Sequence, residues 1–173
     1  MRINIESVRK KDSVSSVDFD YSVEESKKSG YAELLGAEKV DTVRISGEIS
    51  QKNGLVAIVY KIEALFTAYC ARCGKDTFQA IKIDGEGYIA GKSEEDEKDD
   101  GESFYFTETD GILDLDGFIV EFLGVRVPPK YLCSEDCKGL CQQCGKDLNE
   151  GECSCSKKEK NPAFDILDRF FDK

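Results

Sequence analysis

The cysteines are the residues of this sequence with the most chemistry to offer. The chain of 173 residues contains eight of them, two in the turn CARCG and six between Cys133 and Cys155. A C-x2-C-G turn is typical of metal sites, because two thiolates at its ends reach one ion while glycine lets the backbone curl beneath them. The sequence has two such turns, CARCG at 70–74 and CQQCG at 141–145. We therefore predict that cysteine thiolates bind metal in this protein.

The second turn has enough thiolates nearby for a complete tetrahedral site. CQQCG is followed by CSC across a short loop, which gives a first predicted Cys₄ site made of Cys141, Cys144, Cys153 and Cys155. The other four cysteines could form a second site that ties a hairpin turn to the start of the C-terminal segment: Cys70, Cys73, Cys133 and Cys137. Zn²⁺ is the preferred structural ion on prevalence and stability, and spacing alone does not exclude iron.

A redox function for the C-x-x-C pairs is the alternative. Thiol–disulfide oxidoreductases use the same spacing, and usually place the reactive thiol at a helix N-terminus, where its pKa is lowered. Cys70 instead ends a predicted strand, and the residues after Gly74 lead into another strand. The sequence also has no histidine, which removes Ser-His-Asp and Cys-His catalysis. We therefore predict a protein without enzymatic activity, with no catalytic residues, no bound organic cofactor and no small-molecule substrate.

Composition and charge narrow the class of protein further. The N-terminal stretch MRINIESVRK lacks the apolar core of a secretory signal, and no stretch has the apolar length of a membrane span. We therefore expect a cytoplasmic protein without membrane contact. Structural disulfides are rare in the cytoplasm. The net charge is −11, and nine acidic residues lie between Ser93 and Asp110 against Lys98 alone. This pattern predicts a solvated, flexible loop at 93–110.

Alternating apolar residues predict a sheet built from hairpins. The stretch 40–49 alternates and runs into Asn53-Gly54, a dipeptide favoured in tight hairpin turns because both positions tolerate positive φ. The stretch 55–70 then places an apolar residue at every second position, which predicts a long strand with one buried face. A third strand is predicted at 77–89, with a bulge or bend at Gly85 and Gly87. Shorter strands are predicted at 2–5, 17–23 and 104–107.

Helical periodicity follows the acidic stretch. Apolar residues recur at helical spacing from Leu115 to Leu123 behind Asp114 as a candidate N-cap, so a helix is predicted at about 115–125. Further helices are predicted within 24–36 and from Pro162 onward. The fold class is then α+β, a mainly antiparallel β-sheet of long hairpins with a few helices and a C-terminal Cys-rich metal-knuckle segment. We expect a β-rich core domain at 1–128, with the knuckle and a terminal helix at 129–173 packed on it.

The sequence pattern of the C-terminal third includes more than the cysteines. LGVRVPPKYLCSEDCKGLCQQCGKDLNEGECSC follows ILDLDGFIVEFL, with CARC further back in a hairpin and NPAFDIL near the end. In this order, over residues 40–171, the motifs resemble the YceD family of large-subunit ribosomal RNA accumulation proteins. The resemblance implies a bacterial or plastid-type protein that supports accumulation of 23S rRNA, and hence biogenesis of the large ribosomal subunit, without a known enzymatic activity.

The partners implied by this resemblance are large-subunit rRNA, a basic ribosomal protein, or both. Phosphate binding depends on clustered Lys and Arg, so a chain this acidic is not expected to bind RNA tightly without specificity. The acidic loop 93–110 could instead attract a basic ribosomal protein. If RNA is contacted directly, the predicted contacts are the cations in and around the two turns: Arg72, Lys130, Lys138, Lys146, Lys157, Lys158 and Lys160. The same lysines would partly offset the negative charge of the thiolate sites.

Overall fold

A computed structural model of the chain describes residues 1–9, 16–52, 55–91 and 105–155. Most of the predicted acidic loop 93–110, the predicted helix from Pro162, and Lys157, Lys158 and Lys160 lie outside these residues. Along the chain the elements are β1 (Arg2–Asn4), α1 (Glu6–Arg9), β2 (Ser16–Ser22), η1 (Glu25–Lys27), α2 (Lys28–Leu35), β3 (Lys39–Lys52), β4 (Leu55–Tyr69), β5 (Asp76–Gly91), β6 (Tyr105–Glu108), β7 (Ile112–Asp114) and α3 (Leu115–Gly124).

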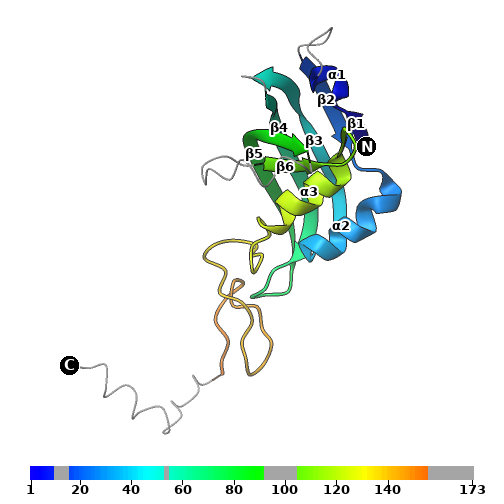
Figure 1. Ribbon diagram of the computed structural model, residues 1–173. Helices are drawn as coiled ribbons and strands as arrows, with labels where there is room; N and C mark the ends of the chain where they lie inside the picture. Colours follow the sequence, from blue (N-terminus) through cyan, green and yellow to red (C-terminus); the bar gives the residue numbers. More distant parts are fainter. Residues whose placement is uncertain (10–15, 53–54, 92–104, 156–173) are drawn as a thin grey trace, which may run out of the picture.

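The main sheet has five strands in the order β2-β3-β4-β5-β6 (Figure 1). Its first four strands pair antiparallel, and β6 runs parallel to β5. The β3–β4 hairpin closes at the pair Lys52↔Leu55; the predicted Asn53-Gly54 turn itself lies outside the described residues. β1 and β7 form a separate antiparallel pair. The predicted α+β fold class, with a mainly antiparallel sheet and few helices, is confirmed.

The buried face of the sheet and the helices above it form the core. In Figure 1, α2 and α3 lie over the same face of the sheet. Ile58, Ile62 and Phe66 of β4 point into this layer and are fully buried, as are Ile119 and Leu123 of α3. Each such side chain contributes roughly 1.5–3 kcal/mol to folding by leaving water. Apolar side chains at every second position of β4, and four residues apart in α3, therefore pack the two elements together.

Helix α3 begins where the sequence predicted. Asp114 has an extended backbone and its Oδ1 accepts a hydrogen bond from the Asp116 amide at 3.2 Å. This satisfies one of the amides that a helix N-terminus leaves without an internal partner. The helix ends at Gly124, and the chain then leaves the sheet. None of the helices among the described residues is long and apolar enough to cross a membrane.

Of the bulge or bend predicted at Gly85 and Gly87 in β5, the strand pairing excludes the bulge. The β4–β5 register is continuous from Val56↔Ile89 to Tyr69↔Asp76. Gly85 is needed for space instead, because a Cβ built on it would lie 2.5 Å from the hydroxyl oxygen of Tyr60 on the paired strand. The one register shift in the main sheet's described pairings occurs in β3, between Val40 and Thr42.

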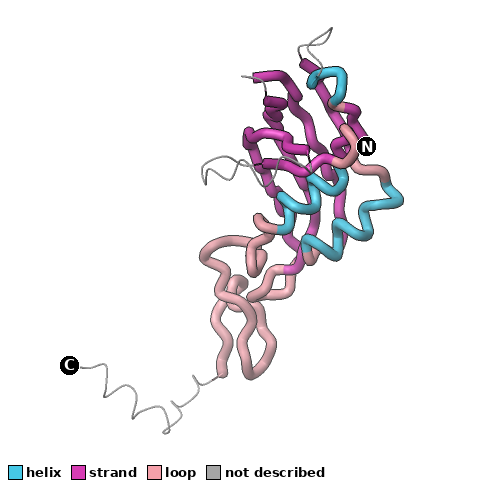
Figure 2. Tube along the Cα trace, viewed as in Figure 1, coloured by secondary structure: helices cyan, strands magenta, loops and turns pink. Residues whose placement is uncertain are grey.

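Residues 125–155 extend from one end of the sheet as turns and loops (Figure 2). Tyr131 attaches the start of this segment to the body, since its hydroxyl donates to the Leu35 carbonyl at 2.7 Å and its ring lies 5.3 Å from that of Phe66. The Ala71 amide donates to the Tyr131 carbonyl at 2.8 Å. The division into a core domain at 1–128 and a knuckle segment at 129–173 stays a prediction.

Candidate metal centre

The turn between β4 and β5 presents the first pair of cysteines. The Cys70 amide donates to the Lys75 carbonyl at 2.8 Å, and the Gly74 amide donates to the Cys70 carbonyl at 2.9 Å. Gly74 has a φ of 71°, a left-handed conformation that side chains with a Cβ disfavour. The glycine after the second cysteine therefore lets the turn close.

The turn CQQCG repeats this local structure. The Cys141 amide donates to the Lys146 carbonyl at 2.8 Å, the Gly145 amide donates to the Cys141 carbonyl at 2.8 Å, and Gly145 has a φ of 72°. The same two hydrogen bonds and the same glycine conformation thus occur at both C-x2-C-G turns. The shared sequence pattern builds the same knuckle twice, once on the sheet and once in the C-terminal segment.

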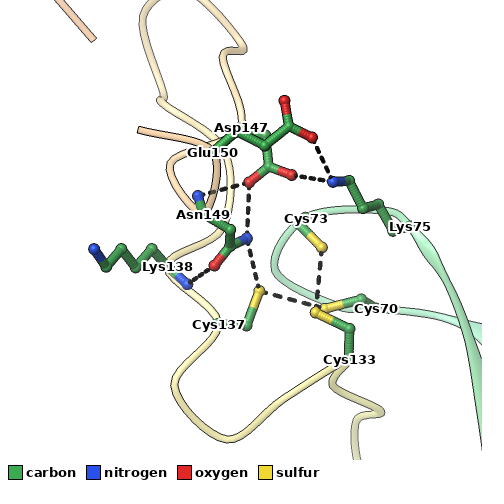
Figure 3. Close-up of polar contacts among 9 residues, drawn as sticks. All are labelled: Cys70, Cys73, Lys75, Cys133, Cys137, Lys138, Asp147, Asn149 and Glu150. Carbon is green, nitrogen blue, oxygen red and sulfur yellow. Dashed lines mark hydrogen bonds and ion pairs between the residues drawn. The ribbon is translucent and has the colours of Figure 1, made fainter. Parts of the chain in front are cut away.

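The first knuckle and the C-terminal segment together form a group of four thiols, which we call site I: Cys70, Cys73, Cys133 and Cys137. All four sulfurs lie within 4.8 Å of one another. Figure 3 shows them converging from the hairpin turn and from the segment beside it. The Sγ atoms of Cys70 and Cys137 are 3.8 Å apart, and those of Cys73 and Cys133 are 3.7 Å apart.

The sulfur spacings of site I suit a tetrahedral ion. A metal–sulfur bond of about 2.3 Å places the corners of a tetrahedron about 3.8 Å apart, close to the sulfur–sulfur distances of 3.7 and 3.8 Å in site I. A disulfide would need a separation of about 2.05 Å, and all eight cysteines are free thiols. Three of the four ligand residues are buried and Cys133 is exposed, so the site lies at the edge of the protein body.

The second group, site II, lies wholly within the C-terminal segment. It consists of Cys141, Cys144, Cys153 and Cys155, whose sulfurs also lie within 4.8 Å of one another. The Sγ atoms of Cys141 and Cys153 are 3.4 Å apart. Its cysteines are half-buried or exposed. Both groups that the sequence predicted are therefore brought together, and either could hold a metal ion.

The electrostatics of both groups favour a cation. Burial raises the pKa of Cys70, but amides of Cys133, Cys73 and Arg72 that donate to its sulfur outweigh burial and lower the pKa to about 6. In site II, hydrogen bonding to Cys144 comes first among the causes that raise the pKa of Cys155 to about 12. The pKa of Cys137 is also lowered, and in site II the amides of Cys144 and Gln143 lower the pKa of Cys141 to about 6. Thiolates thus form readily in each group and oppose ionisation of the remaining thiols. Four thiolates together need a bound cation, and a divalent metal ion would supply that charge.

Polar side chains around site I hold its ligands in place. Asn149 Nδ2 donates to the Cys137 sulfur at 3.4 Å, and Asn149 Oδ1 accepts from the Lys138 amide at 2.8 Å (Figure 3). The Arg72 guanidinium donates to the carbonyls of Glu135 and Cys137 at 3.0 and 2.7 Å. Contacts of this kind orient metal ligands. No sequence pattern indicates the contact of Asn149 with Cys137, because tertiary structure brings the two residues together.

The predicted RNA contacts divide into two kinds. The side chains of Arg72 and Lys146 bond backbone carbonyls within the segment, Lys146 Nζ donating to the Glu152 carbonyl at 2.8 Å. Lys130 and Lys138 are exposed on the same segment. The structure thus uses Arg72 and Lys146 to shape the segment, and leaves Lys130 and Lys138 at its surface.

The redox alternative gains no support from this geometry. Both C-x2-C pairs lie in turns whose glycine leads into a strand or a loop, not at a helix N-terminus. Each pair faces two further thiols at distances that suit an ion. Among the described residues, all eight cysteines belong to one of the two groups.

The fold and the two sites define an α+β protein in which a mainly antiparallel sheet carries a C-terminal segment with two Cys₄ groups able to hold metal ions. The family model of the large ribosomal RNA subunit accumulation protein YceD matches residues 58–171, and the chain belongs to this family. The match extends from within β4 across both groups of cysteines. The resemblance seen in the sequence is thereby confirmed.

Two plant proteins are similar to the chain, and both are named large ribosomal RNA subunit accumulation protein YCED homolog 1, chloroplastic. The Arabidopsis thaliana protein is 21% identical over 151 aligned residues, which cover 72% of this chain and 47% of the relative. The Zea mays protein is 22% identical over 159 aligned residues, which cover 76% of this chain and 54% of the relative. The chain thus spans about half the length of these relatives.

A shorter match joins the chain to an uncharacterized protein of Mycobacterium leprae, which is 41% identical over 39 residues, or 22% of this chain and 18% of the relative. No solved structure matches the chain.

Proposed function

We propose that this protein supports accumulation of large-subunit ribosomal RNA as a non-enzymatic factor, with Zn²⁺ in sites I and II as its structural ions. The observation that carries the proposal is the match of the family model to residues 58–171, which include all eight cysteines. The sulfur positions support the metal part, since the four sulfurs of each group lie within 4.8 Å of one another and the site I spacings of 3.7 and 3.8 Å suit a tetrahedral ion. Every described thiol belongs to such a group, so we assign the ions a structural role. The protein would then act by binding a partner and not by catalysis.

The binding partner we propose is large-subunit rRNA, a basic ribosomal protein, or both. Exposed Lys130 and Lys138 on the segment held by the two sites offer positive charge to a phosphate backbone. The net charge of −11 favours a basic protein elsewhere on the surface. The plant relatives carry a chloroplast location in their names, and a cytoplasmic location for this chain stays a prediction.

The first test measures rRNA in cells. Depletion of the protein is expected to lower the ratio of large-subunit to small-subunit rRNA, and expression of the wild-type chain should restore it. A variant that loses site I, Cys70→Ser with Cys73→Ser, should fail to restore it, because the segment is no longer attached through an ion. An unchanged rRNA ratio on depletion would overturn the proposed role.

The second test separates the two partner classes. Tagged full-length chain is crosslinked in cells, purified, and analysed for both rRNA and ribosomal proteins. If rRNA is contacted through the segment, Lys130→Ala with Lys138→Ala should reduce crosslinked rRNA and weaken the salt dependence of binding. Lys39→Ala, which removes an exposed lysine on the sheet, is the matched control. Retention of basic ribosomal proteins with rRNA at background level would favour the protein partner instead.

The third test identifies the ions. Elemental analysis of protein purified without added metal should find two zinc ions per chain, and one per chain after Cys153→Ser with Cys155→Ser. Iron in place of zinc would show that the proposed metal is wrong, but the two metal sites would stand. Absence of any metal would refute the metal part of the proposal.

A further inference from the structure

The loop between the two ligand pairs of site II does more than connect them. It runs from Gly145 to Glu152, and one of its residues reaches the other metal site: Asn149 Nδ2 lies 3.4 Å from the Cys137 sulfur. Asp147 holds the Asn149 side chain in this position, because Asn149 Nδ2 and the Asn149 backbone amide donate to Asp147 Oδ1 at 2.7 and 2.8 Å. A ligand of site I is therefore held by a residue that belongs to the loop of site II.

An ion pair joins the same loop to the knuckle of site I. Lys75, which follows the CARCG turn, lies with its Nζ 2.7 Å from Asp147 Oδ2 and 2.8 Å from Glu150 Oε1 (Figure 3). The Asp147 side chain is only 10% exposed, so this pair is better shielded from water than an ordinary surface pair. One carboxylate thus positions Asn149 with one oxygen and binds the first knuckle with the other.

Backbone hydrogen bonds complete the connection. The Leu148 amide donates to the Gly139 carbonyl at 2.9 Å, and the Leu140 amide donates to the Arg72 carbonyl at 3.2 Å. A Cβ on Gly139 would lie 2.9 Å from that Arg72 oxygen, so the backbone of the segment lies close to the backbone of the hairpin turn here. Loop, segment and hairpin turn are therefore one bonded unit between the two groups of sulfurs.

Apart from these polar contacts, the loop has only site II to keep it folded. Most of residues 145–152 are exposed, and none of them belongs to the hydrophobic core. In such a segment the free energy of metal binding is the free energy of folding. An empty site II would therefore release the loop, and with it the contact of Asn149 to Cys137.

We propose that the two sites are coupled: an ion in site II holds the loop that places Asn149 on the Cys137 sulfur, and so tightens retention of the ion in site I. Asn149 is the positioning residue of this coupling, and Asp147 with Lys75 fixes its place. The inference rests on the proposed metal sites and not on the proposed role in rRNA accumulation. By linkage, an ion in site I raises the affinity of site II by the same factor.

The test follows site I in the full-length chain loaded with Cd²⁺, because cadmium NMR gives one resonance for each site. EDTA is added stepwise, and the concentration that removes half of the site I signal is recorded. In Asn149→Ala, which keeps all eight thiolates, this concentration should fall about tenfold. Cys153→Ser with Cys155→Ser, which empties site II, should lower it to a similar extent.

Two further variants make the test specific. Adding Asn149→Ala to the variant without site II should lower EDTA resistance no further, because both changes remove the same contact. Gln143→Ala, which shortens an exposed amide side chain in the second knuckle, should leave site I unchanged. Asn149→Asp, which replaces the donor by a carboxylate, should weaken site I at least as much as Asn149→Ala.

The outcomes separate this inference from the one beneath it. Wild-type EDTA resistance of site I in Asn149→Ala would overturn the coupling even if the variant without site II does not fold. Two cadmium resonances that respond to EDTA independently would also overturn it, and leave the metal sites standing. A chain that binds no cadmium would refute the coupling and the metal sites together.

Discussion

Gly85 shows how a single residue without a side chain shapes the sheet. It pairs with Tyr60, whose ring packs edge-on against Phe118 of α3 with 4.8 Å between ring centroids. The Tyr60 hydroxyl occupies the space that a Cβ at position 85 would need. The glycine therefore lets an aromatic residue lie across the neighbouring strand and still reach the helix.

We predict that Gly85→Ala lowers the free energy of unfolding by about 1–3 kcal/mol, because Tyr60 must leave its place in a close-packed core. Chemical denaturation followed by circular dichroism measures this. Gly30→Ala is the matched control, since a Cβ there meets nothing within 4 Å and α2 gains a better helix former. Equal stability of the two variants would show that the Tyr60 contact has no energetic weight.

The Asp116 carboxylate contacts residues from distant parts of the chain, and these contacts lower its pKa. Its Oδ2 lies 2.7 Å from Lys27 Nζ, and its Oδ1 accepts from the Tyr21 hydroxyl at 2.9 Å. Burial raises the pKa of Asp116, but the hydrogen bonds from Lys27, the Met1 amino group and Tyr21 outweigh burial and lower the pKa to about 2. The carboxylate thus ties β2 and η1 to the start of α3.

This pKa predicts a stability that depends on pH. Because the folded-state pKa lies below the ordinary value of 3.8, the carboxylate contributes fully above about pH 4 and its contribution is lost as the pH falls toward 2. Asp116→Asn should therefore lower the free energy of unfolding by about 2 kcal/mol at pH 7, and the deficit should vanish near pH 2. Asp114→Asn is the control, since Asn caps a helix as well as Asp. A deficit that stays constant with pH would contradict the prediction.

At the scale of elements, α3 is joined to the sheet by one face. Ile119 is fully buried, whereas Val120, the next residue, is 45% exposed. Ile119→Ala should lower the free energy of unfolding by about 2–5 kcal/mol through lost burial and the cavity it leaves. Val120→Ala removes apolar atoms from the same helix at a solvent-facing position, and should change stability by about 0.5 kcal/mol or less. Thermal or chemical unfolding of the two variants checks this, and similar losses would contradict the assigned faces.

The strand pairings that the sequence predicted are those between neighbours along the chain. β3, β4 and β5 pair with their neighbours along the chain, so alternation in each strand was enough to find the hairpins. The pairing of β1 with β7 joins Arg2 to Asp114, and a three-residue strand has too short a pattern to reveal such a partner. The parallel pairing of β6 with β5 is likewise invisible in local periodicity.

The sites follow the same division. The knuckles could be predicted because cysteine spacing and the following glycine determine each turn locally. The grouping of Cys70 with Cys137 required the C-terminal segment to return to the hairpin, which the sequence allowed as one alternative. Asn149 and Lys75 were missed because an amide and a lysine in polar turns carry no signal of their own.

At the scale of the whole molecule, two different forces hold two parts of the chain. The sheet and its helices share one hydrophobic core, which is enough to fold a domain of this size. Residues 132–155, the described part of the segment beyond Tyr131, have no comparable core, and the buried cluster there consists of Cys70, Cys73 and Cys137 with Leu132 beside them. Removal of metal should therefore unfold the segment and spare the sheet.

Hydrogen exchange read by mass spectrometry tests this division, with the protein compared before and after EDTA. Amides bonded within the segment, such as those of Cys141 and Leu148, should lose protection, as should the Leu140 amide, which donates to the Arg72 carbonyl of the hairpin turn. Amides of β3 and β4 should keep theirs. Acidification should act in the same direction as EDTA, because protons compete with metal for thiolates. If β4 loses protection together with the segment, the ions stabilise the whole fold, and the sheet is not an independent unit. The Cys70 turn at the end of β4 is where such a loss would begin, because it belongs to both parts.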